Sequence, residues 1–282
     1  MIGHRSSTHC PLLMPRAFML HRMLFIVSWI VLSMGLSGCG SDDTPSSPPP
    51  PPQHTLVFLD GSASAETHPE VHQVFTDSLA RIVRMHLATP GDRLYAFWLH
   101  EKTRSKAYRL DLRNDVRPLQ EKDFPDEQAL ERARYRKDIA EYLERATTDL
   151  QTFAAERDLP EAYARWTDIW GTLEVASETF PSRPGERHVY YLSDMYESMP
   201  GADRRNFDQT PPQRRSQAET WAQADVRRIR SQLTLAPDVL RTLRIRVLQG
   251  TLATKPNAQD VQVYWETLFE TLGIPRENVR YN

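Results

Sequence analysis

The sequence predicts an α/β fold, built as one domain on a doubly wound, mainly parallel sheet with helices on both faces. Short apolar runs that end in an acid, at 55–60 and 187–194, are typical of strands that are buried on both faces. Segments with helical periodicity stand between such runs, and strands that alternate with helices form parallel sheets. No internal repeat is found.

Composition and charge exclude several classes of protein. The chain has 282 residues, with 35 Lys and Arg against 37 Asp and Glu, so its formal net charge is −2. A protein that binds the phosphate backbone of nucleic acid normally carries a basic excess, so we expect no nucleic-acid partner. The 40% of hydrophobic and 26% of charged residues are typical of a soluble globular domain. Two cysteines are too few for a disulfide-stapled fold.

The N-terminus has the features of a bacterial lipoprotein signal. Residues 1–22 contain basic side chains and no acid, and the apolar run 23–36 is too short for an ordinary transmembrane helix. The run ends in LSGC, which resembles the lipobox, and this resemblance implies cleavage before Cys39 and diacylation of its sulfur. We therefore expect residues 1–38 to be a signal peptide that starts at Met1, Met19 or Met23. An uncleaved anchor helix is the alternative.

A lipidated Cys39 would hold the chain in the bacterial cell envelope, because two acyl chains anchor a protein stably. In lipoproteins of this type an Asp directly after the cysteine favours the inner membrane, and here that residue is Gly40. The outer membrane, facing the periplasm, is therefore expected in a cell with two membranes. Residues 39–54 include a run of prolines and cannot form a core, so they are predicted to be the lipidated Cys and a tether.

The folded domain is expected to span 55–282. Its predicted strands are 55–60, 92–100, 106–112, 187–194, 243–248 and 278–281. Its predicted helices are 69–87, 126–157, 167–180, 216–233 and 258–272. Pro69 suits a first helical turn, and Thr167 is well placed as an N-cap. The apolar stripe of the second helix favours packed core; it consists of Ile139, Leu143, Ala146, Leu150 and Phe153.

The region 197–213 is polar and rich in arginine, which predicts a loop. Arg pairs at 204–205, 214–215 and 227–228 are interleaved with acids, which favours a solvated surface of mixed charge over an anion-binding site. His68 and His72 are four residues apart, as zinc ligands on a helix can be. Pro69 stands where the H-E-x-x-H motif requires glutamate, so we expect these histidines to be solvated.

Oxygen-bearing side chains follow two of the predicted strands. Asp60 ends the first strand and is followed by Ser62 and Ser64, and Asp194 ends a later one. Thr167 adds a hydroxyl at a predicted helix N-terminus. In open parallel sheets, ligands bind beyond the carboxyl ends of the strands, at the topological switch point. Carboxylates and hydroxyls without Cys or His favour Mg²⁺, or Mn²⁺ in its place.

These residues resemble the metal-ion-dependent adhesion site of von Willebrand factor type A (VWA) domains. The string DGSAS matches the family's D-x-S-x-S, and Thr167 and Asp194 match its separate threonine and second aspartate. The resemblance covers roughly 54–282 and implies that Ser62, Ser64 and Thr167 contact the metal. It further implies that both aspartates act through water and that a partner's acidic side chain fills an open position. One departure is Met195, where the family usually has glycine.

The sequence thus indicates a lipid-anchored, non-enzymatic envelope protein that binds another envelope or surface protein through Mg²⁺. A scaffold lipoprotein with an unoccupied metal site is the second hypothesis. A metal-dependent hydrolase is third: no G-x-S-x-G motif is present, and Ser62 stands where a haloacid-dehalogenase-type enzyme needs its second aspartate. Each motif also has an ordinary explanation, because Ser62 and Ser64 could begin a turn and Thr167 and Asp194 could cap the segments after them.

Overall fold

The structure is a computed structural model that describes residues 51–60, 69–106, 108–156, 165–180, 185–249, 255 and 257–282, without the side chains of 69–74. The chain divides into two compact units, Met1–Pro49 and Pro50–Asn282, and every element below belongs to the second. The predicted signal peptide, Cys39, Ser62, Ser64 and the two histidines' side chains lie outside the described part.

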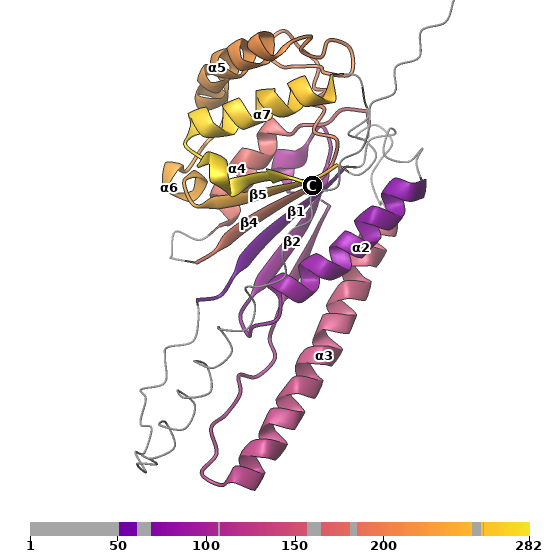
Figure 1. The fold of residues 1–282 in the computed structure, drawn as a ribbon, viewed down its shortest axis with the longest axis vertical. Helices are drawn as coiled ribbons and strands as arrows, with labels where there is room; N and C mark the ends of the chain where they lie inside the picture. Colours follow the sequence, from indigo (N-terminus) through magenta and orange to yellow (C-terminus); the bar gives the residue numbers. More distant parts are fainter. Residues whose placement is uncertain are drawn as a thin grey trace, which may run out of the picture. The chain divides into compact units, whose positions relative to one another are not determined.

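The described residues form a six-stranded sheet in the order β3-β2-β1-β4-β5-β6. Its middle strands β2, β1, β4 and β5 lie side by side in Figure 1. Its strands are β1 (His54–Asp60), β2 (Arg93–Leu99), β3 (Arg109–Arg113), β4 (Arg187–Leu192), β5 (Leu243–Leu248) and β6 (Val279–Tyr281). All neighbouring strands are parallel except β2 and β3, which form an antiparallel pair. The predicted fold class is therefore confirmed, with an antiparallel edge.

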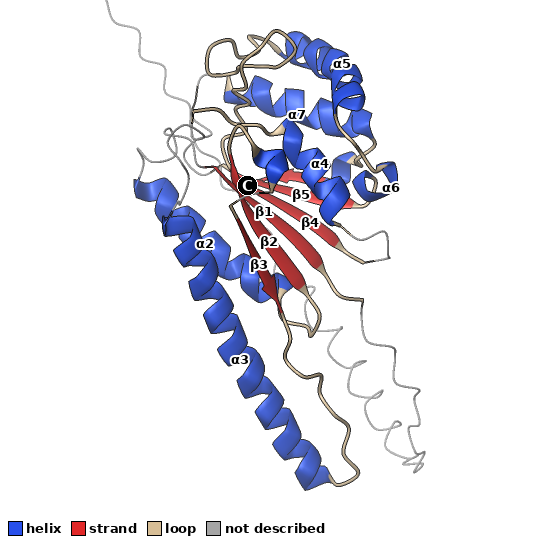
Figure 2. Cartoon of the chain, turned by 180° about the vertical axis from the view of Figure 1, so that it is seen from behind, coloured by secondary structure: helices blue, strands red, loops and turns tan. Residues whose placement is uncertain are grey.

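Helices cover both faces of this sheet, as Figure 2 shows. The helices are α2 (Pro69–His86), α3 (Pro125–Glu156), α4 (Trp170–Thr179), α5 (Arg215–Gln232), α6 (Pro237–Leu240) and α7 (Ala258–Leu272), with 3₁₀ turns at η2 (Thr103–Ser105) and η5 (Arg276–Asn278). The chain winds from β1 to β2 in one direction and from β4 to β6 in the other. Because such crossovers are right-handed, α2 packs on one face and α5 and α7 on the opposite face.

The central strand β1 is buried on both of its faces, as its apolar run predicts. Leu56 and Phe58 belong to the core under α4, α5 and α7, whereas Val57 and Leu59 belong to the core under α2 and α3. Consecutive side chains of a strand point to opposite faces, so one apolar run supplies both cores. Asp60 is the last residue of this buried strand and therefore lies at the carboxyl edge of the sheet.

Helix α3 packs along only part of its length. Ala146 and Leu150 are buried against the sheet, while Leu130, in the first half of α3, has an exposed fraction of 62%. The predicted apolar stripe is thus core only toward the C-terminal end of the helix. The short helix α6 and the antiparallel direction of β3 were not predicted. Within the described ranges, no helix combines the length and the apolar character that crossing a membrane requires.

Candidate metal site

The two predicted aspartates lie at the same end of two neighbouring strands. Asp60 is the last residue of β1, and Asp194 follows the end of β4 by two residues. β1 and β4 are parallel, with Leu59 in register with Leu192, and the winding direction of the sheet changes between them. Both carboxylates are buried. The structure therefore brings these residues to the switch point that the sequence indicates for a ligand.

A buried serine, Ser193, contacts Asp60 and directly precedes Asp194. The Ser193 hydroxyl donates a hydrogen bond of 2.6 Å to Asp60 Oδ2 and accepts one of 3.0 Å from the Met195 N–H. Asp194 Oδ1 accepts a hydrogen bond of 2.9 Å from the Tyr196 N–H. The turn after β4 therefore orients both carboxylates. Ser193 directly precedes Asp194, but no sequence motif indicates its role.

Met195 occupies a backbone position that favours glycine. Its φ of 63° lies in the left-handed region, which glycine adopts without a steric cost. The side chain of Met195 is fully buried in the core beneath α7, and its carbonyl accepts a hydrogen bond of 2.7 Å from Trp265 Nε1. Packing of the side chain thus offsets the backbone strain at a position whose conformation favours glycine.

Lys255 supplies a cation to this cluster that the sequence did not predict. Its ammonium forms an ion pair with Asp194 Oδ2, and its Nζ lies 3.8 Å from Asp208 Oδ1. Nζ also lies 4.6 Å from the centroid of the Tyr196 ring. Burial disfavours the charged form, but attraction by the nearby aspartates, Asp60 among them, raises the pKa of Lys255 overall. The chain's own ammonium therefore compensates part of the negative charge.

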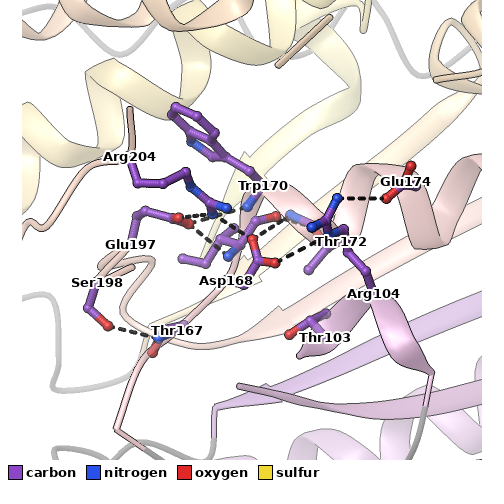
Figure 3. Close-up of polar contacts among 12 residues, drawn as sticks. Thr103, Arg104, Thr167, Asp168, Trp170, Thr172, Glu174, Glu197, Ser198 and Arg204 are labelled. Carbon is purple, nitrogen blue, oxygen red and sulfur yellow. Dashed lines mark hydrogen bonds and ion pairs between the residues drawn. The ribbon is translucent and has the colours of Figure 1, made fainter. Parts of the chain in front are cut away.

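Thr167 is held close to the same edge by the segment that follows Asp194. Its N–H donates a hydrogen bond of 2.8 Å to Ser198 Oγ, and its carbonyl accepts one of 3.2 Å from the Ser198 N–H (Figure 3). The prediction that Thr167 is the helix N-cap is wrong, because α4 begins at Trp170. Thr167 belongs instead to the loop that leads into α4.

The capping groups of α4 are carboxylates. Glu197 Oε2 accepts hydrogen bonds from the N–H groups of Ile169, at 2.7 Å, and Trp170, at 3.3 Å. Asp168 Oδ1 accepts one of 2.8 Å from the Gly171 N–H. Two acids satisfy the free N–H groups at the start of the helix, where negative charge is favourable. Because Glu197 comes from a distant segment, local sequence pattern did not reveal it.

Arg204 completes this network, as Figure 3 shows. Its Nη2 donates a hydrogen bond of 2.6 Å to Asp168 Oδ1 and forms an ion pair with Glu197, while its guanidinium lies 4.7 Å from the Trp170 ring centroid. Burial raises the pKa of Glu197 to about 8, an effect that the charge of Arg204 opposes. The contact between Arg204 and Glu197 links the segment after β4 to the start of α4.

The predicted solvated arginine surface is therefore wrong at the first Arg pair. Only 13% of the Arg204 side chain is exposed, and Arg205 Nε lies 2.6 Å from Oδ2 of Asp225, an acid that is fully buried. Arg205 lies in the loop before α5, and Asp225 lies within α5, so this pair forms only when the chain folds. Periodicity in a single segment cannot distinguish such buried pairs from exposed ones.

The chemistry of the donor set fits a hard cation. Asp60, Asp194 and Thr167 offer only oxygen atoms, as Mg²⁺ prefers. The described part of the chain holds no group of three His, Cys, Asp or Glu side chains that could bind a metal, so hydroxyl ligands would have to complete the shell. Full access to Asp194 requires the Lys255 ammonium to move away from it.

The comparisons with known proteins give no family assignment. No family model and no curated protein matches the chain. Proximal thread matrix protein 1 from the mussel byssus is 12% identical over 83% of this chain and 44% of its own, with a TM-score of 0.39. Another structure of that protein, described as having a zinc-occupied MIDAS motif, has a TM-score of 0.38.

A third solved structure is an aerotolerance-related membrane protein from Bacteroides fragilis. It is 11% identical, covers 70% of this chain and 66% of its own, and has a TM-score of 0.33. The chain spans less than half the length of the mussel protein. Similarity at this level carries no argument about function. By its own strand order and helix placement, the chain is a doubly wound α/β protein.

Proposed function

We propose that the domain is a VWA-like, non-enzymatic module that binds a partner protein through a divalent metal ion. The observation that carries this proposal is the position of two buried carboxylates, Asp60 and Asp194, at the switch point of the sheet, where the Ser193 hydroxyl holds Asp60 through a hydrogen bond. Two buried carboxylates at that place favour a bound cation.

The residues of the chain have distinct roles in this proposal. Asp60 and Asp194 supply negative charge; the Ser193 hydroxyl orients Asp60, and the Tyr196 N–H orients Asp194. Thr167 supplies a hydroxyl from a loop that Ser198 holds in place. Ser62 and Ser64 are assigned by the resemblance to the VWA motif alone. When bound, Mg²⁺ or Mn²⁺ would offer an open coordination position to a carboxylate of the partner.

The setting proposed for this activity is the bacterial cell envelope. Lipidation of Cys39 would hold the protein in the membrane, and the proline-rich residues after it would extend the domain away from the lipid surface. The partner is then another envelope or surface protein with an exposed acidic side chain. Nucleic acid is not proposed, because the chain has no basic excess.

One observation favours a second candidate function, a scaffold lipoprotein that works without metal. The Lys255 ammonium already forms an ion pair with Asp194 and attracts Asp60 and Asp208. A chain that compensates its carboxylates internally needs no metal to keep them buried. In that case the partner would bind elsewhere, such as on the exposed first half of α3, which includes Leu130.

Calorimetry with Mg²⁺ and Mn²⁺ tests the proposal on the compact unit Pro50–Asn282. We expect binding by the wild-type unit, with thermal stabilisation that grows with metal concentration, by about 2.7 kcal/mol at a hundred times the Kd. Asp60→Ala should abolish this binding. Thr167→Val should weaken it, since the change removes the hydroxyl but keeps the backbone contacts to Ser198. The matched control is Asp115→Ala, an exposed acid that pairs with Arg113.

Two results would contradict the proposal. Absence of binding up to about 10 mM metal would favour the scaffold function, since such weak affinity has no use for partner capture. Equal binding by the wild type and Asp60→Ala would place the metal elsewhere. Turnover of a phosphoester or carboxylic ester in a substrate panel, lost in Asp60→Ala, would instead indicate the hydrolase.

A further inference from the structure

A polar pocket lies between α2 and the strands β4, β5 and β6. Its volume is about 410 Å³, and its wall includes Arg81 from α2, Tyr190 from β4, Arg246 from β5 and Arg280 from β6. The neighbours of these strand residues, such as Val247, point into the core on the opposite face. The pocket is therefore on the α2 side of the sheet, whereas α5 and α7 cover the other side.

Strand register brings two of the arginines side by side. Tyr190 is in register with Arg246, and Arg246 is in register with Arg280. Register partners of parallel strands point to the same face, and neighbouring strands lie about 4.8 Å apart. Like charges on directly opposed residues repel each other and destabilise the sheet. This row of the sheet thus carries an electrostatic cost that a bound anion would remove.

None of the three arginines has an acidic partner among the residues that the structure describes. Arg81, Arg246 and Arg280 form no ion pair there. Arg244, two residues before Arg246 on the same strand, does form one, at 3.2 Å from Glu186 Oε1. Asn282 also lines the pocket without an ion pair to these guanidiniums. Their positive charge is therefore available to a ligand.

An electrically neutral hydrogen-bond network includes two residues of the pocket wall, His86 and Tyr190. His86 Nδ1 donates to Gln53 Oε1, at 2.9 Å, because that oxygen can only accept; Nε2 therefore accepts from the Tyr190 hydroxyl, at 2.7 Å. Burial, followed by the charges of His188 and Arg246, lowers the pKa of His86 to about 3. The network adds no positive charge at neutral pH, so the positive charge of the pocket comes from the guanidiniums.

We propose that this pocket binds a phosphate group, carried by a small phosphorylated molecule or by a lipid headgroup. Arginine suits this ligand, because its planar fork of donors matches the oxygens of phosphate. Three guanidiniums that approach from α2, β5 and β6 favour an anion with several charges over a single carboxylate. Met85 and Leu248 also line the pocket and offer apolar surface to the carbon part of the ligand.

Calorimetry of the unit Pro50–Asn282 with pyrophosphate and inorganic phosphate, in a buffer free of other phosphate, tests the proposal. We expect saturable binding, with affinity lowered about tenfold or more in Arg246→Gln and in Arg280→Gln, as for the loss of one charge-assisted hydrogen bond. Both side chains are at least partly exposed, so these variants should fold. Arg244→Gln is the matched control on the same strand and should bind as the wild type does.

A lipid arm distinguishes the two sources of phosphate. Vesicles of phosphatidylcholine with phosphatidic acid are compared with vesicles of phosphatidylcholine alone. Binding only to the former, lost in Arg246→Gln but not in Arg244→Gln, supports a lipid headgroup, and binding of pyrophosphate without vesicle binding supports a soluble ligand. The proposal is overturned if neither probe binds, if all variants bind equally, or if citrate binds as tightly as pyrophosphate.

Discussion

Arg204 and Glu197 form a buried ion pair that couples the two segments carrying candidate ligands. Glu197 follows Asp194 by three residues, and its second oxygen accepts a hydrogen bond from Ile169, two residues after Thr167. The arrangement of Asp194 relative to Thr167 therefore depends on this carboxylate, together with the two hydrogen bonds between Thr167 and Ser198. Such a link can maintain a binding geometry without touching the ligand.

Replacing Glu197 tests this coupling. Glu197→Ala should lower the free energy of unfolding by about 3–5 kcal/mol, because it leaves the buried charge of Arg204 with Asp168 as its remaining acidic contact and frees the N–H groups of Ile169 and Trp170. Glu197→Gln keeps an acceptor for these N–H groups and should cost less. Urea denaturation measures both variants, and equal loss in the two would contradict a role for the acceptor.

Met195→Gly tests the balance between backbone strain and packing. Glycine relieves the strain at a φ of 63°, worth about 1 kcal/mol. Loss of the fully buried side chain costs about 2–5 kcal/mol, so we expect net destabilisation. Met195→Leu, which conserves volume, should change stability by less than about 1.5 kcal/mol. A glycine variant more stable than the wild type in thermal unfolding would show that strain dominates.

Lys255→Met tests competition between the ammonium and a metal ion. If the proposed metal site exists, removal of the ammonium should raise the affinity for Mg²⁺ about tenfold or more, because the cation no longer displaces a positive charge from Asp194. The variant should be less stable than the wild type without metal and regain stability with it.

The control for this change is Lys255→Arg, which keeps the positive charge and should not bind Mg²⁺ more tightly than the wild type. Calorimetry compares the three proteins at one ionic strength, since salt screens partly exposed charges. Weaker Mg²⁺ binding by Lys255→Met would indicate that the lysine supports the ligand site and does not compete for it.

The buried His86 should make folding sensitive to acid. Its pKa of about 3 in the folded protein lies below the ordinary value of 6.5, so between these values the unfolded chain binds the proton first. Stability from this residue is complete above pH 6.5 and is lost as the pH falls toward 3, with a slope of at most about 1.4 kcal/mol per pH unit.

His86→Gln should reduce this slope while keeping a side chain that can hydrogen-bond Tyr190. Part of the slope will remain, because burial also lowers the pKa of His100, to about 4, and that of His188. Urea denaturation between about pH 7 and about pH 5, in phosphate-free buffer, provides the comparison. An unchanged slope in the variant would show that His86 does not titrate on unfolding in this range.

The sequence by itself determined the fold class, because apolar runs and helical periodicity depend on local order. The strands 55–60 and 243–248 and the helix 258–272 match the structure closely. The same patterns placed Asp60 and Asp194 after strands that prove to be neighbours at the sheet's switch point. Burial of β1 on both faces also followed from its composition.

Tertiary structure alone decided which charges are paired. Glu197 caps α4 in place of Thr167, Lys255 lies against Asp194, and Arg204 is buried, because each of these partners comes from a different segment. The row formed by Arg246 and Arg280 likewise depends on strand register, which local pattern does not specify. Electrostatic contacts act through space, so a site built from them emerges only when the chain is folded.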